Sequence, residues 1–396
     1  MTLHITHIAP TSYFSDYGCH VRIYEETRAL ASLGYQSTIY TYGGGVSPGP
    51  AQIVRIPKFA DDGAVRVGSQ LKKVWLDPIL LATASFRGIG KPIDLVHAHL
   101  HEGALIGKFV AMSRRVPMVF DFQGSLLAEM LDHGFIDRHS RLTSLISLVE
   151  DSINRLPNKI ITSSTNARNL LIDSFNIEPE RVVAISDCVD TNAFTPRPGH
   201  PEHNRSRIIN RYHIPNNRLL IGYLGLLADY QGIPHLIEAA AKVIESFPGA
   251  HFLIMGYPGV ETYQRMATQK GIQDHVTFTG RISYFEAPQH LAATDIAVSP
   301  KLSETEGNGK LLNYMATGLP TVAFDGEVAR EYLGESGRFA VPGDHHSLAE
   351  HILELLNNAT TRTCEGTSLR TRAVANFSWD RGRSQLHNIY QELLQC

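Results

Sequence analysis

The chain has 396 residues, of which 43% are hydrophobic, and a formal net charge of −3. This length is sufficient for two domains, and the near-balanced charge excludes a general nucleic-acid binder, which needs a basic face. Four cysteines lie far apart in the sequence, and no His/Cys group has zinc-site spacing, so neither a disulfide framework nor a structural zinc site is expected. No apolar run reaches membrane-spanning length, and we expect a cytoplasmic protein.

The N-terminal segment predicts a strand, a helix and a second strand. The apolar run Leu3–Pro10 leads into a loop that ends at Gly18, followed by a helical pattern over His20–Leu33 and a second apolar run over Ser37–Tyr42. In such a unit the first loop lies at the C-terminal edge of the sheet, where open α/β folds bind ligands. Gly18 is therefore a candidate for close approach to a ligand, and an ordinary turn glycine is the alternative.

The segment Val67–Phe86 predicts a helix that Pro78 interrupts. Lys72 and Lys73 stand beside Trp75 in it. Basic residues next to an exposed aromatic are typical of a helix that lies on a membrane surface. A half-buried core helix with a solvated face is the commoner explanation, so both interpretations stay open.

Three histidines occupy alternate positions after a short apolar run. The strand is predicted over Leu95–Ala98, and His97, His99 and His101 would share one side if it continued. That pattern could indicate a metal site. We instead expect a loop at the strand end, in which His99 lines a ligand-binding cleft, and no metal.

The next predicted strand, Pro117–Phe122, leads directly into Gln123. This position also falls at the C-terminal end of a parallel strand, so Gln123 is a candidate neutral hydrogen-bonding group toward a ligand. Asp121 and Glu129 are weaker candidates nearby.

The second half of the chain repeats the alternation of strands and helices after a polar, proline-rich run over Pro196–Asn204. The expected strands are Leu219–Leu224, His251–Met255, Val276–Thr279 and Ile296–Ser299. Alternation in both halves predicts an α/β protein with two doubly wound parallel domains joined by this linker.

The stretch from Ser299 to Asp325 is the most informative part of the sequence. A strand end is followed by a polar loop over Leu302–Gly309, a helical pattern over Lys310–Thr317 and a buried strand over Thr321–Phe324. Such a loop offers backbone N–H groups and a helix N-terminus, which suit a phosphate. A lysine at that helix start opposes the helix dipole, and a bound anion would reverse the cost. The alternative is a solvated helix start.

The same stretch resembles a known signature. Glu306-Gly-Asn-Gly, followed by Asn313-Tyr-Met-Ala-Thr-Gly-Leu-Pro-Thr-Val-Ala, is similar to the donor site of family 4 retaining glycosyltransferases. Asn313 stands where that family usually has a second glutamate, and the spacing from Glu306 is one residue short. The resemblance implies the GT-B fold, with two Rossmann-like domains facing across a cleft.

The resemblance also implies the domain limits and the roles of the candidate residues. We expect an acceptor-binding domain over residues 1–196, a donor-binding domain over 205–376, and a terminal helix, 377–396, that packs back on the first domain. By the same resemblance, Glu306 would hold sugar hydroxyls, with His99 and Gln123 on the sugar and acceptor side. The implied donor-binding residues are Gly18, Gly225, Gly256, Arg281, Ile282, Gly307, Asn308, Gly309, Lys310, Leu311 and Asn313.

Two departures weaken the expected diphosphate grip. Where the family has an arginine and a lysine after the first strand of its second domain, this chain has Leu226 and Gln231. A charge-assisted hydrogen bond contributes roughly 1.5–3 kcal/mol. Lys310, the helix start and Arg281 are the expected substitutes.

The resemblance implies a retaining hexosyltransferase that moves a sugar from a nucleotide-sugar to a lipid, glycan or small-molecule acceptor, without a metal or other cofactor. No protein nucleophile is expected, because in such enzymes the leaving phosphate is thought to deprotonate the acceptor. Peripheral membrane contact through the first domain is a further expectation. The alternatives are a catalytically weakened binding protein of the same fold, a phosphorylase or an epimerase.

Overall fold

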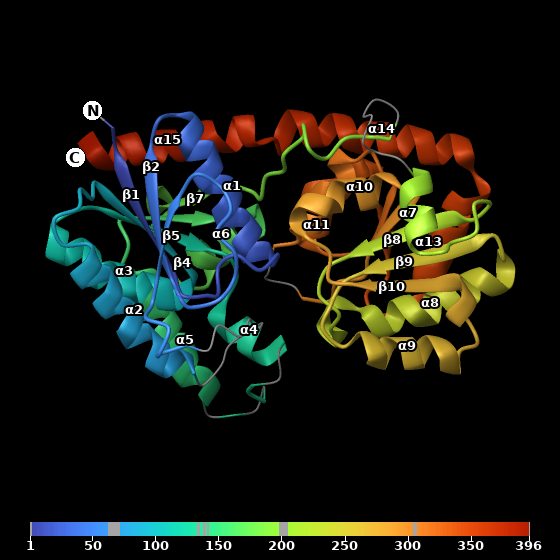
Figure 1. Cartoon of the computed structure of the whole chain (residues 1–396), viewed down its shortest axis with the longest axis horizontal. Coiled ribbons are helices and arrows are strands. Elements are labelled where there is room, and N and C mark those ends of the chain that lie inside the picture. The colour runs from blue at the N-terminus through green and yellow to red at the C-terminus, as the bar shows by residue number, and fades with distance from the viewer. Residues whose placement is uncertain are drawn as a thin grey trace. The chain divides into compact units, whose positions relative to one another are not determined.

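The computed structural model describes residues 2–61, 72–132, 135–137, 140, 142–197, 205–303 and 307–395. The chain forms two compact units, shown in Figure 1. The first comprises Met1–Asp187, Thr305–Gly307 and Trp379–Cys396, and the second comprises Cys188–Glu304 and Asn308–Ser378. Each unit is described by itself below.

The first unit is built on a parallel sheet with the strand order β3-β2-β1-β4-β5-β6-β7. Its strands are β1 His4–Ala9, β2 Gln36–Thr41, β3 Gln52–Arg55, β4 Leu95–His99, β5 Met118–Phe122, β6 Lys159–Thr162 and β7 Val182–Ala184. The central strands β4 and β5 are buried along their whole length, as expected for a parallel sheet covered on both faces.

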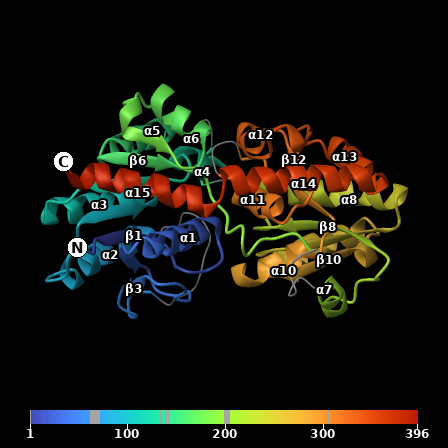
Figure 2. The same cartoon turned by 90° about the horizontal axis from the view of Figure 1, so that it is seen from above.

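Helices cover both faces of this sheet (Figures 1 and 2). They are α1 Gly18–Ser32, α2 Lys73–Arg87, α3 Leu100–Arg114, α4 Leu126–Asp132, α5 Leu142–Asn154, α6 Thr165–Asp173 and α15 Trp379–Gln395. On one face, α2, α3, α5 and α6 pack on a core that includes Phe120. On the other face, α1 and the C-terminal α15 pack on a core that includes Ile5 and Tyr390.

The second unit has a parallel sheet with the order β10-β9-β8-β11-β12-β13. Its strands are β8 Leu219–Leu224, β9 Ala250–Met255, β10 Val276–Gly280, β11 Ile296–Ser299, β12 Thr321–Phe324 and β13 Arg338–Ala340. Its helices are α7 Arg205–Arg211, α8 Ile233–Ser246, α9 Val260–Gln269, α10 Ala287–Ala292, α11 Gly309–Ala316, α12 Glu327–Leu333, α13 His345–Asn357 and α14 Ala359–Asn376. Two apolar cores, one on each face, hold these layers together.

Both units confirm the predicted fold class, because each is a parallel sheet with helices on both faces. The order of each sheet reverses direction beside its first strand, so that β1 lies between β2 and β4 and β8 lies between β9 and β11. Ligands of open α/β sheets bind at such a switch point, at the carboxyl ends of the strands. The loops that follow these strands therefore hold the candidate site residues. Within the part of the chain that is described, none of the helices combines the length and the hydropathy needed to cross a bilayer.

Candidate donor and acceptor sites

Lys310 is the centre of the site in the second unit. It lies in the first turn of α11, and its Nζ donates to Oε1 of Gln231 at 2.6 Å and to the hydroxyl of Tyr223 at 3.3 Å. The ammonium also lies 4.6 Å from the centroid of the Tyr223 ring, within range of a cation–π interaction. The chain therefore holds a cation beside Gln231, at the end of β8.

Two glycines allow this approach. A Cβ at Gly225 would lie 2.9 Å from the Lys310 Nζ, and Gly225 has φ +150°, a conformation that other residues rarely adopt. A Cβ at Gly256 would lie only 2.0 Å from the carbonyl oxygen of Gly225. The Gly225 amide donates to the Met255 carbonyl at 3.0 Å, so the loops after β8 and β9 touch through their backbones. Gly225 and Gly256 thus have a steric role that the sequence pattern did not specify.

Asn308 and Tyr314 fix the start of α11 to the sheet. The Asn308 side-chain amide donates to Oγ of Ser299 at 3.1 Å, and both side chains are buried. The Tyr314 hydroxyl accepts from the amide of Leu224 at 2.8 Å. The first turn of α11 is therefore anchored to the ends of β11 and β8, which keeps Lys310 in place.

The remaining residues of this loop have different surroundings. The Leu311 side chain is fully buried and its amide donates to the Asn308 carbonyl at 2.9 Å, so Leu311 supports the turn and its amide is already engaged. Asn313 is half-buried, and its side chain makes no hydrogen bond with any residue that the structure describes. Gly307 groups with the first unit, and Glu306 lies outside the described residues.

Arg281 and Tyr257 form a flat cationic group in the loops after β10 and β9, at the same carboxyl edge of the second sheet as Gly225 and Gly256. The Arg281 guanidinium lies 5.4 Å from the centroid of the Tyr257 ring, and its side chain is exposed. Ile282 is buried in the core below. An aromatic ring with a guanidinium over it can stack on a planar base, whereas Ile282 can only support the loop.

In the first unit, Asp121 connects the two residues that were expected to face the sugar. Its carboxylate accepts from Nε2 of Gln123 at 2.7 Å, from Nδ1 of His99 at 3.1 Å and from Nε of Arg22 at 3.0 Å. Burial alone would raise the pKa of Asp121, but the Arg22 guanidinium and the bonds from His99 and Gln123 outweigh it and hold the pKa below its usual value. Because its Nε2 donates to Asp121, the Gln123 amide turns its oxygen away from that carboxylate.

His99 itself is fully buried, which differs from the expected position lining an open cleft. Its Nε2 lies 3.1 Å from Nδ1 of His7. When His99 carries a proton on Nδ1 alone, it donates that proton to Asp121, and its Nε2 can accept from Nδ1 of His7. His99 can therefore influence a ligand only through Asp121 and Gln123 in this arrangement.

The same buried cluster contains the groups that most resemble a metal site. The ligand atoms of His7, His97 and His99 lie within 4.8 Å of one another, as do those of Glu26, His97, His99 and Asp121. The rings of His7 and His99 are nearly parallel, with an interplanar angle of 9°. Burial, together with the His99 imidazole, lowers the pKa of His7 and of His97, whereas burial and the nearby Asp121 raise that of Glu26. Burial therefore favours the neutral forms of His7, His97 and Glu26 in this cluster.

The segment after His99 does not form the loop that the sequence predicted. Helix α3 begins at Leu100, directly after His99. His101 therefore lies in a helix, buried against the rings of Phe120 and Phe122.

Gly18 is the first residue of α1, and a Cβ there would meet nothing within 4 Å. Packing does not require this glycine, and the space above it is open.

Family models match both halves of the chain. The model described as glycosyl transferase 4-like domain matches residues 17–188, and that described as glycosyl transferases group 1 matches residues 204–371. The chain belongs to these glycosyltransferases. The predicted family is thereby confirmed, and the departures at Leu226 and Gln231 lie within a genuine member of it.

Relatives and solved structures agree with this assignment. The 2-deoxystreptamine glucosyltransferase of Streptomyces kanamyceticus is 25% identical over 358 residues, which are 85% of this chain and 89% of that protein. The D-inositol 3-phosphate glycosyltransferase of Corynebacterium efficiens is 24% identical over 76% of this chain and 72% of its own. The solved sucrose-phosphate synthase from Thermosynechococcus elongatus superposes with a TM-score of 0.84 at 17% identity, over 99% of each chain. The glycosyltransferase thus has the GT-B fold.

The sequence interpretation missed several residues of these sites, namely Arg22, Tyr223, Ser299, Tyr257, His7 and Glu26. Arg22 and Tyr223 lie inside a helix and a strand, where a buried polar residue and a core aromatic give no distinct pattern, and Ser299 ends a strand. A buried arginine is rare unless it is paired, so Arg22 could have been singled out only once its burial was known. Tyr223 could have been identified from its spacing to Gly225. The Tyr223-x-Gly225 pattern places the ring and the glycine together at the end of the same strand.

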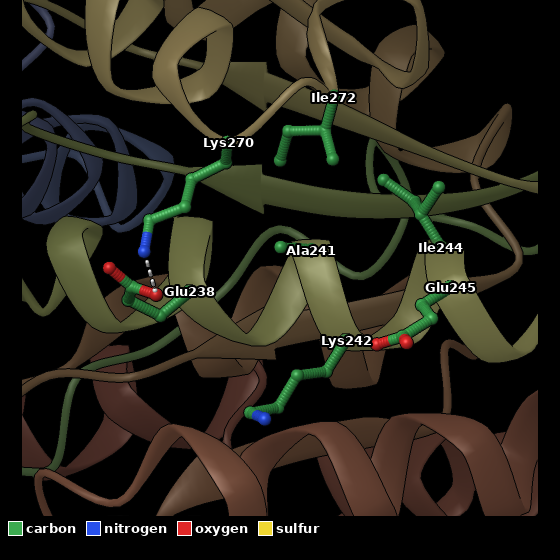
Figure 3. Close-up of a pocket in the computed structure, with 7 residues that line it drawn as sticks. All are labelled: Glu238, Ala241, Lys242, Ile244, Glu245, Lys270 and Ile272. Carbon is green, nitrogen blue, oxygen red and sulfur yellow. Dashed lines mark ion pairs between the residues drawn. The ribbon is translucent and has the colours of Figure 1, made fainter.

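A separate surface hollow of the glycosyltransferase lies along α8, shown in Figure 3. It is lined by Glu238, Ala241, Lys242, Ile244, Glu245, Lys270 and Ile272. Lys270 and Glu238 form an ion pair of 2.7 Å in it, and both side chains are partly exposed. Neither Lys310 nor Gly225 lines this hollow.

Proposed function

We propose that this glycosyltransferase moves a hexose from a nucleotide-sugar to an acceptor with retention of the anomeric configuration. The observation that carries the proposal is the Lys310 ammonium, held by Gln231 and Tyr223 over Gly225 at the switch point of the second sheet. A structure of Anabaena HepE, which covers 99% of this chain with a TM-score of 0.76 at 17% identity, contains UDP-glucose. That comparison supports a nucleotide-sugar as the donor.

The donor would be bound by parts with different chemistry. Lys310 and the amides of the Gly307–Gly309 loop would hold the diphosphate, because a cation and a helix start both attract an anion. Asn313 would bond the ribose with its unengaged amide. The Arg281–Tyr257 pair and the backbone at Gly256 would face the base, and Glu306 would hold hydroxyls of the sugar.

The acceptor side would be provided by the first unit. We assign Gln123 to direct contact, with its amide oriented by Asp121, and His99 to a positioning role beneath it. Gly18 leaves room at the start of α1. Two relatives carry names that specify a hydroxylated ring as acceptor, 2-deoxystreptamine and an inositol phosphate. A polyhydroxylated small molecule, glycan or glycolipid is therefore the proposed acceptor class.

The transfer step breaks the bond between the anomeric carbon and the diphosphate oxygen and forms a bond from that carbon to an acceptor oxygen. The acceptor proton passes to the departing phosphate oxygen, so no protein nucleophile is needed. Negative charge grows on the diphosphate as the bond breaks, and the fixed Lys310 ammonium stabilises that change without having to reorganise.

We propose that no metal takes part in this step. The buried histidine cluster of the first unit contains the Arg22 guanidinium, hydrogen-bonded to Asp121. A dication bound by Asp121 would face this cation in a medium that screens little. In the second unit, Lys310 supplies the positive charge that a metal would otherwise bring to a diphosphate.

The principal alternative is a binding protein of the same fold, because Leu226 and Gln231 replace two cations of the family signature. A phosphorylase would instead accept free phosphate, and an epimerase would need an acid–base pair of carboxylates near the sugar. All three alternatives keep the fold and differ in the chemistry at the bound sugar and phosphate.

The deciding experiment is incubation of the full chain with a panel of nucleotide-sugars, with and without 2-deoxystreptamine or inositol 3-phosphate. We expect nucleoside diphosphate release that depends on the acceptor, and an α-linked product by NMR from an α-configured donor. The Lys310→Ala variant should lose this activity, whereas Lys270→Ala, in the hollow along α8, should keep it. Release of a sugar phosphate on addition of free phosphate would identify a phosphorylase, and tight donor binding without release would identify a binding protein.

A further inference from the structure

The two units differ in how many large hydrophobic side chains they expose. Among the described residues, 15 of the 19 exposed large hydrophobics belong to the first unit and four to the second. Most of the 15 lie on α2, α3 and α5, or just after α2. Single exposed apolar residues need no explanation, but a contiguous group indicates a binding surface.

These helices are neighbours on the same face of the first sheet. α3 contacts α2 on one side and α5 on the other, and Figure 1 shows the three helices on the side of the sheet opposite α15. Their inner faces pack on the core. Their outer faces point away from that core, so the three outer faces form one layer.

The outer stripe of each helix is apolar where an ordinary surface helix is polar. On α3, Leu105, Phe109 and Met112 recur at i, i+4 and i+7, and Phe109 is 62% exposed. On α5, Leu145 and Leu148 continue the same pattern, and Leu148 is 63% exposed.

The outer stripe of α2 follows the same rule. Trp75, Pro78, Ala82 and Phe86 recur at i, i+3, i+7 and i+11, and all four are exposed. Trp75 is 76% exposed, and Ile89 extends the stripe beyond the helix. We name the surface formed by Trp75, Phe86, Phe109, Met112, Leu145 and Leu148 the α2–α3–α5 face.

The charges around this face are predominantly positive. Residues 72–91, 100–115 and 142–155, which contain the three helices, hold eight Lys or Arg and four Asp or Glu, whereas the whole chain has a net charge of −3. The acidic residues are engaged: Glu102 pairs with Lys73 and Asp151 with Arg155, Asp77 accepts from Tyr42, and Glu150 is buried.

Four of the cations gather at one end of the face. Arg87 and Lys91 end the α2 segment and Arg114 and Arg115 end the α3 segment, and these helices lie side by side. A side chain added at Gly88 would come within 3.5 Å of the Arg114 guanidinium, so the two ends are close. Cations at helix C-termini also complement the helix dipole, but the dipole does not account for the apolar stripes beside them.

We propose that the α2–α3–α5 face binds the surface of an anionic lipid bilayer. Aromatic and long aliphatic side chains next to Lys and Arg insert at the boundary of headgroups and acyl chains, while the cations meet lipid phosphates. A second copy of this chain fits the face less well, because a twofold contact would oppose two surfaces of the same positive sign. This proposal stands apart from the catalytic one, since its tests require no donor or acceptor.

Tryptophan fluorescence and sedimentation with vesicles test the proposal. The chain has two tryptophans, and Trp379 is only 8% exposed, so added vesicles should shift chiefly the emission of Trp75 to shorter wavelength. Vesicles of phosphatidylcholine with about one third phosphatidylglycerol should sediment the full-length chain at low salt, and phosphatidylcholine alone should sediment much less. Because the lipid attraction is electrostatic in part, raising the salt concentration should release the protein.

The variant Phe109→Ser/Leu148→Ser should weaken partitioning at least tenfold, because each buried large side chain contributes about a factor of ten. Phe285→Ser, at an exposed position of the second unit, is the matched control and should change nothing. All three substitutions are at exposed positions, so the fold should be retained, as circular dichroism can verify. Arg114→Gln/Arg115→Gln should reduce binding to the anionic vesicles about fivefold per charge.

Three results would overturn the proposal. The first is an absence of sedimentation with anionic vesicles at low salt. The second is equal partitioning of Phe109→Ser/Leu148→Ser and the unaltered protein. The third is a concentration-dependent dimer in light scattering that the same two substitutions abolish, which would assign the face to a second copy of the chain.

Discussion

The Lys310 ammonium lies 2.6 Å from the side-chain oxygen of Gln231, the residue that replaces a lysine of the family signature. The cation lost at position 231 is thus present at almost the same place, but it arrives from α11 instead of from the loop after β8. Gly225 gives it room, because any Cβ there would touch the Nζ. Gln231, which lacks the charge of the family's lysine, and Lys310, which lies at the start of α11, therefore act together. Lys310 supplies the positive charge, and Gln231 accepts a hydrogen bond from it.

This arrangement predicts the effect of removing the ammonium. Lys310→Ala should weaken the binding of a nucleoside diphosphate by about 1.5–3 kcal/mol, the range of a charge-assisted bond. Isothermal calorimetry measures the dissociation constant directly. Lys270→Ala, which removes a lysine from the exposed pair with Glu238, is the control. An unchanged constant for Lys310→Ala would mean that Lys310 does not contribute to nucleoside diphosphate binding.

Gly256 should be sensitive to the smallest substitution. In Gly256→Ala the new Cβ would lie 2.0 Å from the Gly225 carbonyl oxygen, so the loops after β8 and β9 must separate. We expect the free energy of unfolding to fall by roughly 1–3 kcal/mol, as for other overpacking changes. Urea unfolding gives this value. Gly326→Ala, at the N-cap of α12 where a Cβ meets nothing within 4 Å, should cost less, about 1 kcal/mol or below, and equal losses would contradict the steric explanation.

The periodicity and punctuation of the sequence predicted most of the second unit. The strands β11 and β12 begin and end as expected, and α11 begins one residue earlier, because apolar runs bounded by Gly and Pro leave few alternatives. In the first unit, the histidine pattern predicted a loop where α3 begins at once. The reason is local: Leu100 adopts φ +62°, which turns the chain from strand to helix within one residue. Apolar periodicity does not report such a turn.

The site was harder to predict because its members bond one another through space. The sequence identified His99 and Gln123 separately, but not that Asp121 binds both of them and Arg22 at once. Residues 22 and 121 are far apart in the chain, and only the alignment of α1 with β5 brings them together. The burial of His99 follows from the same packing.

The buried pair of Arg22 and Asp121 predicts a large effect on stability. In Asp121→Asn the guanidinium loses a partner that is itself fully buried, and truncating one member of such a pair costs about 3–5 kcal/mol. The comparison is Asp151→Asn, which breaks the more exposed pair with Arg155 and should cost within about 1 kcal/mol. Chemical unfolding of both variants measures the difference. Similar small losses would show that Glu26 and Asp187 suffice to compensate Arg22.

His101 predicts a pH dependence of stability. Burial lowers the pKa of His101 to about 4, whereas an unfolded histidine titrates near 6.5. Between these values the unfolded chain binds more protons, so the contribution of His101 falls as the pH falls below about 6.5. The loss from pH 7 to pH 5.5 should be about 1 kcal/mol for this residue.

The variant His101→Gln removes this titration while keeping a polar side chain. The difference between its unfolding free energies at pH 7 and pH 5.5 should therefore be smaller than that of the unaltered protein by about 1 kcal/mol. Any cost of the substitution itself cancels, because it is present at both pH values. His345→Gln, at the half-buried first residue of α13, should alter the pH difference less. An unchanged difference in His101→Gln would mean that the pKa of His101 is the same in the folded and in the unfolded chain.

Glu306 and Asn313 should affect different kinetic quantities if the proposed donor orientation is correct. Glu306 would contact the transferred sugar, whose charge and ring shape change in the transition state, so Glu306→Gln should lower turnover more than it weakens nucleotide binding. Asn313 would contact the ribose, which changes little during transfer, so Asn313→Ala should raise the apparent dissociation constant of the donor with a smaller effect on turnover. Steady-state kinetics combined with direct nucleotide binding separates the two. If both variants changed both quantities equally, the loop before α11 would hold the donor in a different orientation, with the sugar and the ribose not divided between these residues.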